Sequence, residues 1–141
     1  MNKKFYEATV NINSTPENIW KILTDAPGYS QWDNGVERVE GKISPGKTIK
    51  VYAKVSPGRA FPVKVTELCP DSKMVWSGGM PFGLFKGVRI FTLSTQVNGT
   101  ITFKMREEFS GPMLSMIWSS MPDLGPSFEQ FARGLKARAE S

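Results

Sequence analysis

The chain has 141 residues, of which 40% are apolar and 22% charged, with a formal net charge of +5. This length predicts one domain spanning residues 1–141, and the composition is that of a globular rather than a disordered protein. No apolar run is long enough to cross a bilayer, and no apolar stretch follows the basic segment Met1–Glu7. We therefore expect neither stable membrane insertion nor a signal peptide.

The sequence contains no histidine and one cysteine, Cys69. Without histidine, the serine–histidine and cysteine–histidine catalytic arrangements and His-based metal sites are excluded. We expect no metal or cofactor, because zinc would have to be held by carboxylates alone. Cys69 can form no internal disulfide, which fits a cytoplasmic location, and we expect it to be an unreactive, half-buried thiol at a strand end.

The positive charge raises the question of nucleic-acid binding. The basic residues are scattered along the chain, and those near its end suit the last turns of a helix, where cations complement the helix dipole. No recognition-helix pattern accompanies them, so we expect no nucleic-acid partner.

The first third of the sequence predicts a strand followed by two short helices. Apolar and polar residues alternate from Tyr6 to Asn13, which is the period of a half-buried strand. A helix then begins at residues 14–17, with either Thr15 as the N-cap or Ser14 and Glu17 in a capping box. It ends at residues 25–28, and a second short turn covers residues 29–32.

Several short strands follow, separated by segments rich in turn-forming residues. They are expected at residues 36–43, 48–55, 61–68 and 74–78. Such spacing favours an antiparallel meander over a parallel α/β sheet.

The next two strands form a hairpin whose register can be predicted. A two-residue turn at Asn98-Gly99 would place Phe91 and Leu93 on the same face as charged residues. A three-residue loop, with Gly99 in a bulge, pairs Phe91 with Met105 and Leu93 with Phe103 instead. We choose the bulge because it collects the apolar residues on one face, and it makes Arg89 oppose Glu107.

The last segment, residues 112–139, has a helical apolar stripe interrupted by Pro122, Gly125 and Pro126. The prolines must kink or break the helix between residues 121 and 127. Met113, Met116 and Met121 lie near Trp118 in its first half. A plain core stripe explains this pattern, and so does an adaptable ligand wall, because methionine packs around varied shapes.

Four stretches occur in an order that carries a family resemblance. They are Thr15 to Trp20, Asp25 through Tyr29 to Trp32, Met74 to Trp76 with Leu84 to Phe91, and Glu107 to Pro112 leading to Phe128, Phe131 and Leu135. In this order they resemble the START-like (SRPBCC) superfamily, within it the polyketide cyclase/dehydrase and lipid-transport group.

The resemblance implies an α+β helix-grip fold. In that fold a seven-stranded curved antiparallel sheet wraps around a long C-terminal helix, with two short helices between strands 1 and 2 and an apolar cavity between sheet and helix. Two departures stand out. Asp33-Asn34-Gly35 replaces a proline that often follows the second motif, and Arg89 stands where many relatives have histidine. A guanidinium does not give up its proton, so base chemistry at that position is in doubt.

The resemblance implies binding or transport of a mostly apolar small molecule, such as a lipid, quinone or polyketide. We expect the wall of this site to comprise Trp76, Phe91, Phe103, Met105, Trp118 and Met121, with Arg89 and Glu107 as its polar anchor. A cyclase or dehydratase with Glu107 as base and Arg89 stabilising an enolate is the second hypothesis. A bonded Arg89–Glu107 pair favours binding, and an unpaired Glu107 favours catalysis.

The loop at residues 78–83 has three glycines and a proline around Phe82. It could be an ordinary hairpin loop or a gate in which Phe82 covers the site. An interaction module working through Pro81 to Leu84 is the third functional hypothesis.

Overall fold

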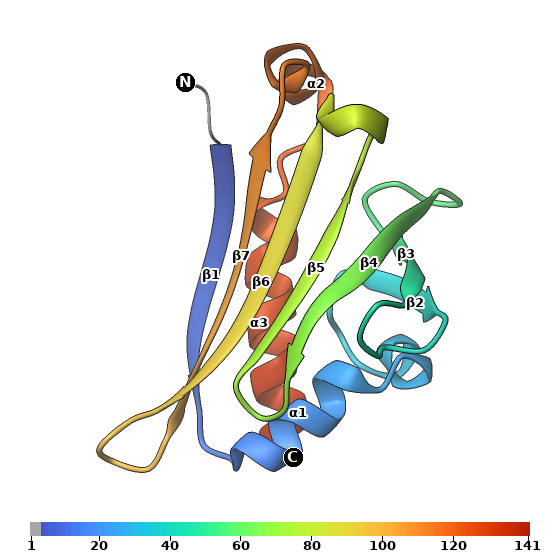
Figure 1. Cartoon of the computed structure of the whole chain (residues 1–141). Coiled ribbons are helices and arrows are strands. Elements are labelled where there is room, and N and C mark those ends of the chain that lie inside the picture. The colour runs from blue at the N-terminus through green and yellow to red at the C-terminus, as the bar shows by residue number, and fades with distance from the viewer. Residues whose placement is uncertain (1–3) are drawn as a thin grey trace.

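A seven-stranded antiparallel sheet curls around the C-terminal helix in the computed structural model, which describes residues 4–141 (Figure 1). The spatial order is β1-β7-β6-β5-β4-β3-β2. The strands are β1 (Lys4–Ile12), β2 (Val36–Glu40), β3 (Thr48–Ala53), β4 (Ala60–Cys69), β5 (Lys73–Gly79), β6 (Lys86–Thr95) and β7 (Ile101–Ser110). The helix-grip prediction is confirmed, and Met1, Asn2 and Lys3 lie outside the described residues.

Two short helices, α1 (Pro16–Thr24) and the 3-10 helix η1 (Pro27–Gln31), connect β1 to β2. Thr15 is the N-cap of α1, and its Oγ1 accepts a hydrogen bond from the Asn18 backbone N–H at 3.1 Å. Pro16 at the first helical position needs no such partner, because it has no N–H. Of the two predicted starts, the Thr15 cap is therefore correct.

The β6–β7 hairpin has the predicted bulged register. Phe91 pairs with Met105, Leu93 with Phe103, and Arg89 with Glu107. Gln96 and Thr100 close the three-residue loop with a 2.8 Å hydrogen bond, and Gly99 adopts a φ of +86°. Glycine tolerates this conformation at no steric cost, so the loop sets the register that puts the apolar side chains on the inner face.

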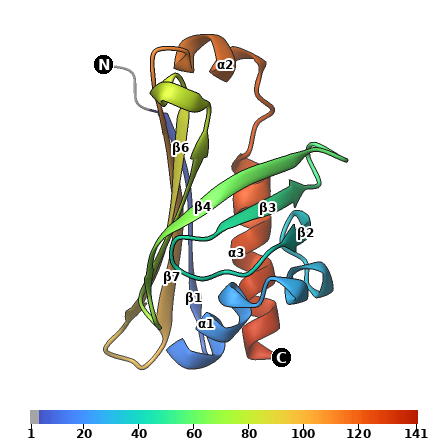
Figure 2. The same ribbon diagram turned by 45° about the vertical axis from the view of Figure 1, so that its right-hand side comes forward.

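The C-terminal segment breaks where the prolines predict. The short helix α2 (Leu114–Ser120) lies across one end of the sheet, and α3 (Gly125–Glu140) runs along its inner face (Figure 2). Residues 121–124 separate them, and Pro126 lies in the first turn of α3. None of the helices in the range 4–141 is long and apolar enough to span a membrane.

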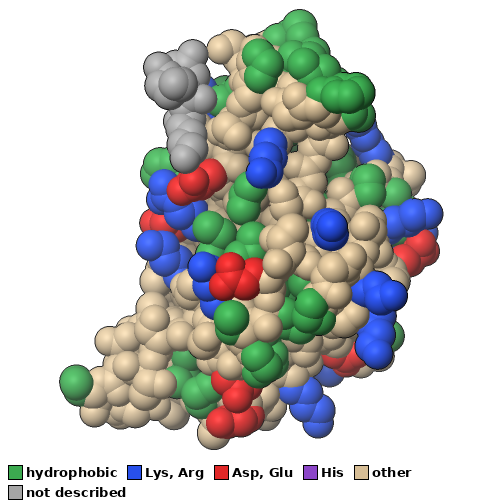
Figure 3. Space-filling view, in the orientation of Figure 1, with side chains coloured by type: hydrophobic (Ala, Val, Ile, Leu, Met, Phe, Trp, Pro, Cys, Tyr) green, Lys and Arg blue, Asp and Glu red, His purple; other side chains and the backbone are tan. Residues whose placement is uncertain are grey.

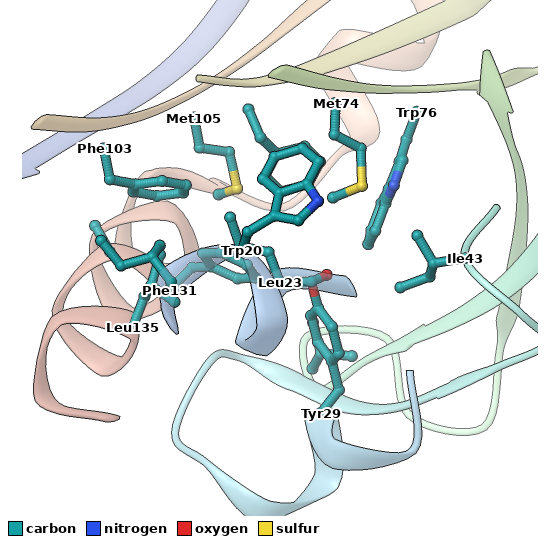
Figure 4. Close-up of a cluster of buried hydrophobic side chains, with 14 of the residues drawn as sticks. Trp20, Leu23, Tyr29, Ile43, Met74, Trp76, Phe103, Met105, Phe131 and Leu135 are labelled. Carbon is teal, nitrogen blue, oxygen red and sulfur yellow. The ribbon is translucent and has the colours of Figure 1, made fainter. Parts of the chain in front are cut away.

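The core lies between the inner face of the sheet, α1, η1 and α3. Figure 4 shows Phe103 and Met105 of β7 facing Phe131 and Leu135 of α3, all fully or almost fully buried. The expectation that Cys69 is half-buried was wrong. It is exposed at the last position of β4, where the side chain leaves the packed part of the sheet.

One end of α3 is fastened by close and polar contacts. A Cβ on Gly134 would overlap the Asp33 backbone oxygen, so only glycine lets the helix approach this segment. Gln130 Nε2 donates to Asp33 Oδ1, and Asn18 Nδ2 donates to the Ala139 oxygen at 3.1 Å. Within the described range, the side-chain hydrogen bonds that join α3 to the part of the chain before β2 all fall between residues 130 and 140 of the helix.

Candidate functional site

An ion pair lies on the inner face of the sheet, near the end covered by α2. Arg89 of β6 and Glu107 of β7 are cross-strand partners, and Arg89 Nε and Nη2 each lie 2.8 Å from Glu107 Oε1. The side chains are 21% and 17% exposed. The predicted pair is therefore present and largely, though not fully, removed from solvent.

Aromatic rings surround this pair. The guanidinium carbon of Arg89 lies 4.8 Å from the centroid of the Phe128 ring of α3, which is a cation–π geometry. Tyr6, the β1 partner of Glu107, stacks on Trp118 of α2 with centroids 5.3 Å apart. Phe109 completes this group, which we call the upper aromatic cluster (Tyr6, Phe109, Trp118 and Phe128).

Gly87 leaves room beside the second oxygen of Glu107. A Cβ at Gly87 would lie 2.6 Å from Glu107 Oε2 and 3.3 Å from the Phe109 ring. Arg89 Nε and Nη2 both lie on the Oε1 side of the carboxylate, and Oε2 occupies the space that a side chain at position 87 would need. The carboxylate is thus held by Arg89 on one side and packed against Gly87 on the other.

The structure separates the predicted site residues into two groups. Trp76, Phe91, Phe103 and Met105 are at most 3% exposed and belong to the core, where Phe91 and Phe103 each contact the Phe131 ring with centroids 6.0 Å apart. Trp118 and Met121 lie higher, on and just after α2, and are half-buried. The Arg89–Glu107 pair lies between these groups, while Phe82 is 98% exposed and covers nothing.

Trp76, in the core group, has a buried N–H donor without a partner. It pairs with Arg89 across β5 and β6, and it is 3% exposed. Its indole Nε1 is buried without a hydrogen-bond partner among the residues that the structure describes. An unpaired buried donor is costly, so this one favours an added acceptor.

A buried hydroxyl near Arg89, that of Tyr29, is committed to the protein. Tyr29 donates to the Leu23 oxygen at 2.7 Å, and burial raises the pKa of its phenol well above the usual range. Tyr29 is therefore a structural group rather than a proton donor for chemistry.

A surface cleft of about 440 Å³ lies away from the pair, beside the C-terminal half of α3. It is lined by Trp32, Asp33, Arg133, Gly134, Ala137, Arg138 and Ser141. None of the eight predicted ligand-binding residues lines this cleft.

Sequence reasoning missed three residues of the site. Tyr6 occupies an inward position of a predicted strand, and Phe128 one of a predicted helix. The two residues are far apart in the sequence, and neither pattern shows that their side chains meet. Gly87 sits inside a strand pattern, and an isolated glycine there is a known sign of close approach by another group. That signal could have identified Gly87 as the residue beside Glu107.

The comparisons with known proteins agree with this fold. The sequence model described as "Polyketide cyclase / dehydrase and lipid transport" matches residues 6–140. No curated protein sequence matches the chain significantly.

Solved structures with low sequence identity share the architecture. A hypothetical protein from Helicobacter pylori is 14% identical with a TM-score of 0.74, covering 98% of this chain and 88% of that one. The Zhui aromatase/cyclase from a Streptomyces species is 14% identical with a TM-score of 0.71, covering 99% and 94%. A START superfamily protein from Mycobacterium smegmatis is 15% identical with a TM-score of 0.69, covering 96% and 97%. At these identities, the likeness shows the fold.

Proposed function

The chain belongs to the polyketide cyclase / dehydrase and lipid transport family of START-like proteins, and from this premise we propose that it binds or carries a mostly apolar small molecule. The ligand would be a lipid, quinone or polyketide-like compound held between the sheet and the C-terminal helix. Its place is the α2 end of the sheet, because that is where half-buried rings and a polar anchor occur together.

The Arg89–Glu107 pair is the observation that carries this proposal. An ion pair inside an apolar surround contributes little to stability compared with apolar residues of the same volume. It does give a bound molecule a fixed charged donor and acceptor, which stay 21% and 17% exposed. The unpartnered Trp76 Nε1, one strand away, adds a second donor for the ligand's polar group.

The rest of the ligand would lie against rings. The upper aromatic cluster supplies flat apolar surface, and Trp76, Phe91, Phe103 and Met105 form the floor below the pair. Trp118 now stacks on Tyr6, so a ligand enters this space when α2 moves and Trp118 and Met121 become its wall. The seven-residue α2 suits such a movement, because it has one buried side chain and no side-chain cap.

The competing hypothesis is a cyclase or dehydratase in which Glu107 takes a proton and Arg89 stabilises an enolate. The geometry supports binding over this reaction. Arg89 Nε already donates to Glu107 Oε1 at 2.8 Å, so the guanidinium and the carboxylate are bonded to each other, which is the arrangement expected of a polar anchor.

Titration with N-phenyl-1-naphthylamine, a neutral probe that fluoresces in apolar surroundings, tests the proposal. We expect saturable binding that quenches tryptophan emission by energy transfer. Trp118→Phe should lose most of the quenching contributed by the site, and Trp32→Phe, which alters the distant α3 cleft, should retain it. Absence of saturable binding, or equal effects of the two changes, would contradict a ligand site at the α2 end.

A further inference from the structure

An exposed apolar surface forms the α2 end of the molecule. It contains Phe82 at 98% exposure, Met116 at 61%, Met80 at 39% and Leu84 at 36%. These four residues, which we call the apolar tip, come from the β5–β6 loop and from α2. Figure 3 shows apolar side chains gathered at this end of the molecule.

The two segments of the tip are built as one unit. The Met113 N–H, just before α2, donates to the Leu84 oxygen at 2.9 Å, and the Met80 N–H donates to the Phe85 oxygen at 2.8 Å. A Cβ at Gly111 would lie 2.5 Å from the Leu84 oxygen, so the chains approach closely. The loop is therefore fixed against α2 rather than hanging free.

Phe82 is held outward in an unfavourable conformation. Its φ is +62°, in the left-handed region that an aromatic residue rarely adopts. Neither the ring nor the backbone gains burial in return, since Phe82 is the most exposed residue of the tip. Strain of this kind, when observed, points to a function for the presented side chain.

The tip itself carries no charge, and two lysines lie at its rim. Residues 74–85 and 109–122 contain no charged side chain. Lys4 pairs with Phe109 and Lys86 pairs with Ser110, so both lysines lie where the strands reach the tip. Lys4 Nζ lies 5.7 Å from the centroid of the Trp118 ring.

The carboxylates nearest to the tip are already engaged. Glu108 accepts from Arg106 Nε at 2.9 Å, and Asp123 Oδ1 accepts from the Gly125 N–H at 2.9 Å. A negatively charged surface that approaches the tip meets two lysines at its rim, with Glu108 balanced by Arg106 and Asp123 bonded to the Gly125 N–H.

We propose that the apolar tip docks on the interface of an anionic lipid bilayer. Phe82 and Met116 enter the boundary between headgroups and acyl chains, and Lys4 and Lys86 lie at the level of the lipid phosphates. A tryptophan beside a lysine, as at Trp118 and Lys4, is typical of residues placed at that boundary. The docking is peripheral and reversible, because it uses a few side chains and no spanning helix.

Vesicle co-sedimentation tests the proposal, with vesicles of phosphatidylcholine alone and with added phosphatidylglycerol. We expect binding to the anionic vesicles that weakens as salt is added. Phe82→Ser with Met116→Ser should lower the partition coefficient about tenfold. Val97→Ser is the matched control, because Val97 is fully exposed in the β6–β7 loop at the opposite end of the sheet, and it should leave binding unchanged.

The lysines are tested in the same way. The double change Lys4→Gln with Lys86→Gln should abolish the preference for anionic vesicles. The control is Lys21→Gln with Lys50→Gln, which removes the same charge away from the tip and should preserve most of that preference. Phe82→Trp provides a direct readout, since its emission should be quenched by bromine-labelled lipids on binding. All these positions are exposed, so melting curves should match the parent protein.

Several results would overturn the proposal. These are equal binding to neutral and anionic vesicles, an equal loss with Val97→Ser, or no quenching of the tryptophan at position 82. Concentration-dependent dimerisation that the Phe82 and Met116 changes abolish, without vesicle binding, would assign the tip to a second copy of the chain.

Discussion

The Arg89 Nε and Nη2 atoms both lie 2.8 Å from a single oxygen of Glu107, Oε1, and Nε donates a hydrogen bond to it. The other oxygen, Oε2, lies against Gly87, where a Cβ would be 2.6 Å from it. The ion pair and this close packing together fix the orientation of both side chains.

A double-mutant cycle at this pair should show strong coupling. Arg89→Leu alone leaves Glu107 largely buried without its donors, and we expect a loss of about 2 kcal/mol in unfolding free energy. Arg89→Leu with Glu107→Leu should recover much of that loss. Chemical denaturation of the parent, both single variants and the double variant measures the coupling, and purely additive losses would show that the pair carries none.

The same variants test the role of the pair in ligand choice. The double variant should bind neutral N-phenyl-1-naphthylamine as well as the parent does, because the rings remain. The net charge of the double variant equals that of the parent, because one positive and one negative side chain are removed. If the parent binds the neutral probe and its sulfonated analogue with different affinities because of the pair, the double variant should lose that difference. An unchanged preference would remove Arg89 and Glu107 from the binding site.

Gly134→Ala should destabilise the protein although it adds a better helix former. In an open helix the change would stabilise by about 1 kcal/mol. Here the new Cβ would meet the Asp33 oxygen, and we expect a net loss of about 2 kcal/mol or more from overpacking. Gly125→Ala, where the nearest atom is a side-chain oxygen at 3.2 Å, is the control and should be nearly neutral in thermal melts.

The elements could be predicted because their signals are local, whereas their arrangement as a helix-grip fold was implied by the family resemblance. The period of the strands, the Thr15-Pro16 helix start and the prolines at 122 and 126 each depend on neighbouring residues. The β6–β7 register followed from one loop glycine and the need to bury Phe91 and Phe103 together. The Gly134–Asp33 contact could not be predicted, because it joins residues far apart in sequence and depends on how deeply a helix settles.

The site could be predicted only in part for the same reason. Arg89 and Glu107 lie on adjacent strands of one hairpin, so their meeting followed from the register. Tyr6, Trp118 and Phe128 come from three separate elements, and only the folded chain brings them together. The exposure of Phe82 and the burial of Phe103 also depend on how α2 and α3 pack, which periodicity does not show.

Acid should weaken an ion-pair network on the outer face of the sheet. A hydrogen bond from Arg106 holds the pKa of the Glu7 carboxyl below its usual value of 4.5, with Lys104 acting in the same direction. Because the folded-state pKa is lowered, this contribution to stability is present above pH 4.5 and is lost as pH falls through the folded value.

Glu7→Gln should therefore lower the melting temperature by about 2 °C at pH 7. The difference from the parent should shrink below pH 4.5 and vanish in stronger acid. Glu129→Gln removes a carboxylate from α3, on the other side of the sheet, and should not reproduce this pH dependence. A constant difference at all pH values would show that the ionised carboxyl of Glu7 is not the source.

Hydrogen exchange should distinguish the two C-terminal helices. We expect amides of α2 to exchange much faster than those of residues 130–140, because α2 has one buried side chain and no side-chain cap. Addition of N-phenyl-1-naphthylamine should slow exchange in α2. The predicted gate at Phe82 further requires slower exchange in residues 78–83, and unchanged exchange there would rule out the gate alone.

The two halves of α3 are held by different kinds of contact. Gly134 and Gln130 fasten the helix to Asp33, and Asn18 binds its last turn. Toward Gly125 the helix is held by ring packing instead, with Phe128 buried against Tyr6 and Arg89. Rings can slide past one another without breaking a hydrogen bond, so this half of the helix can repack while the strand pairing stays unchanged.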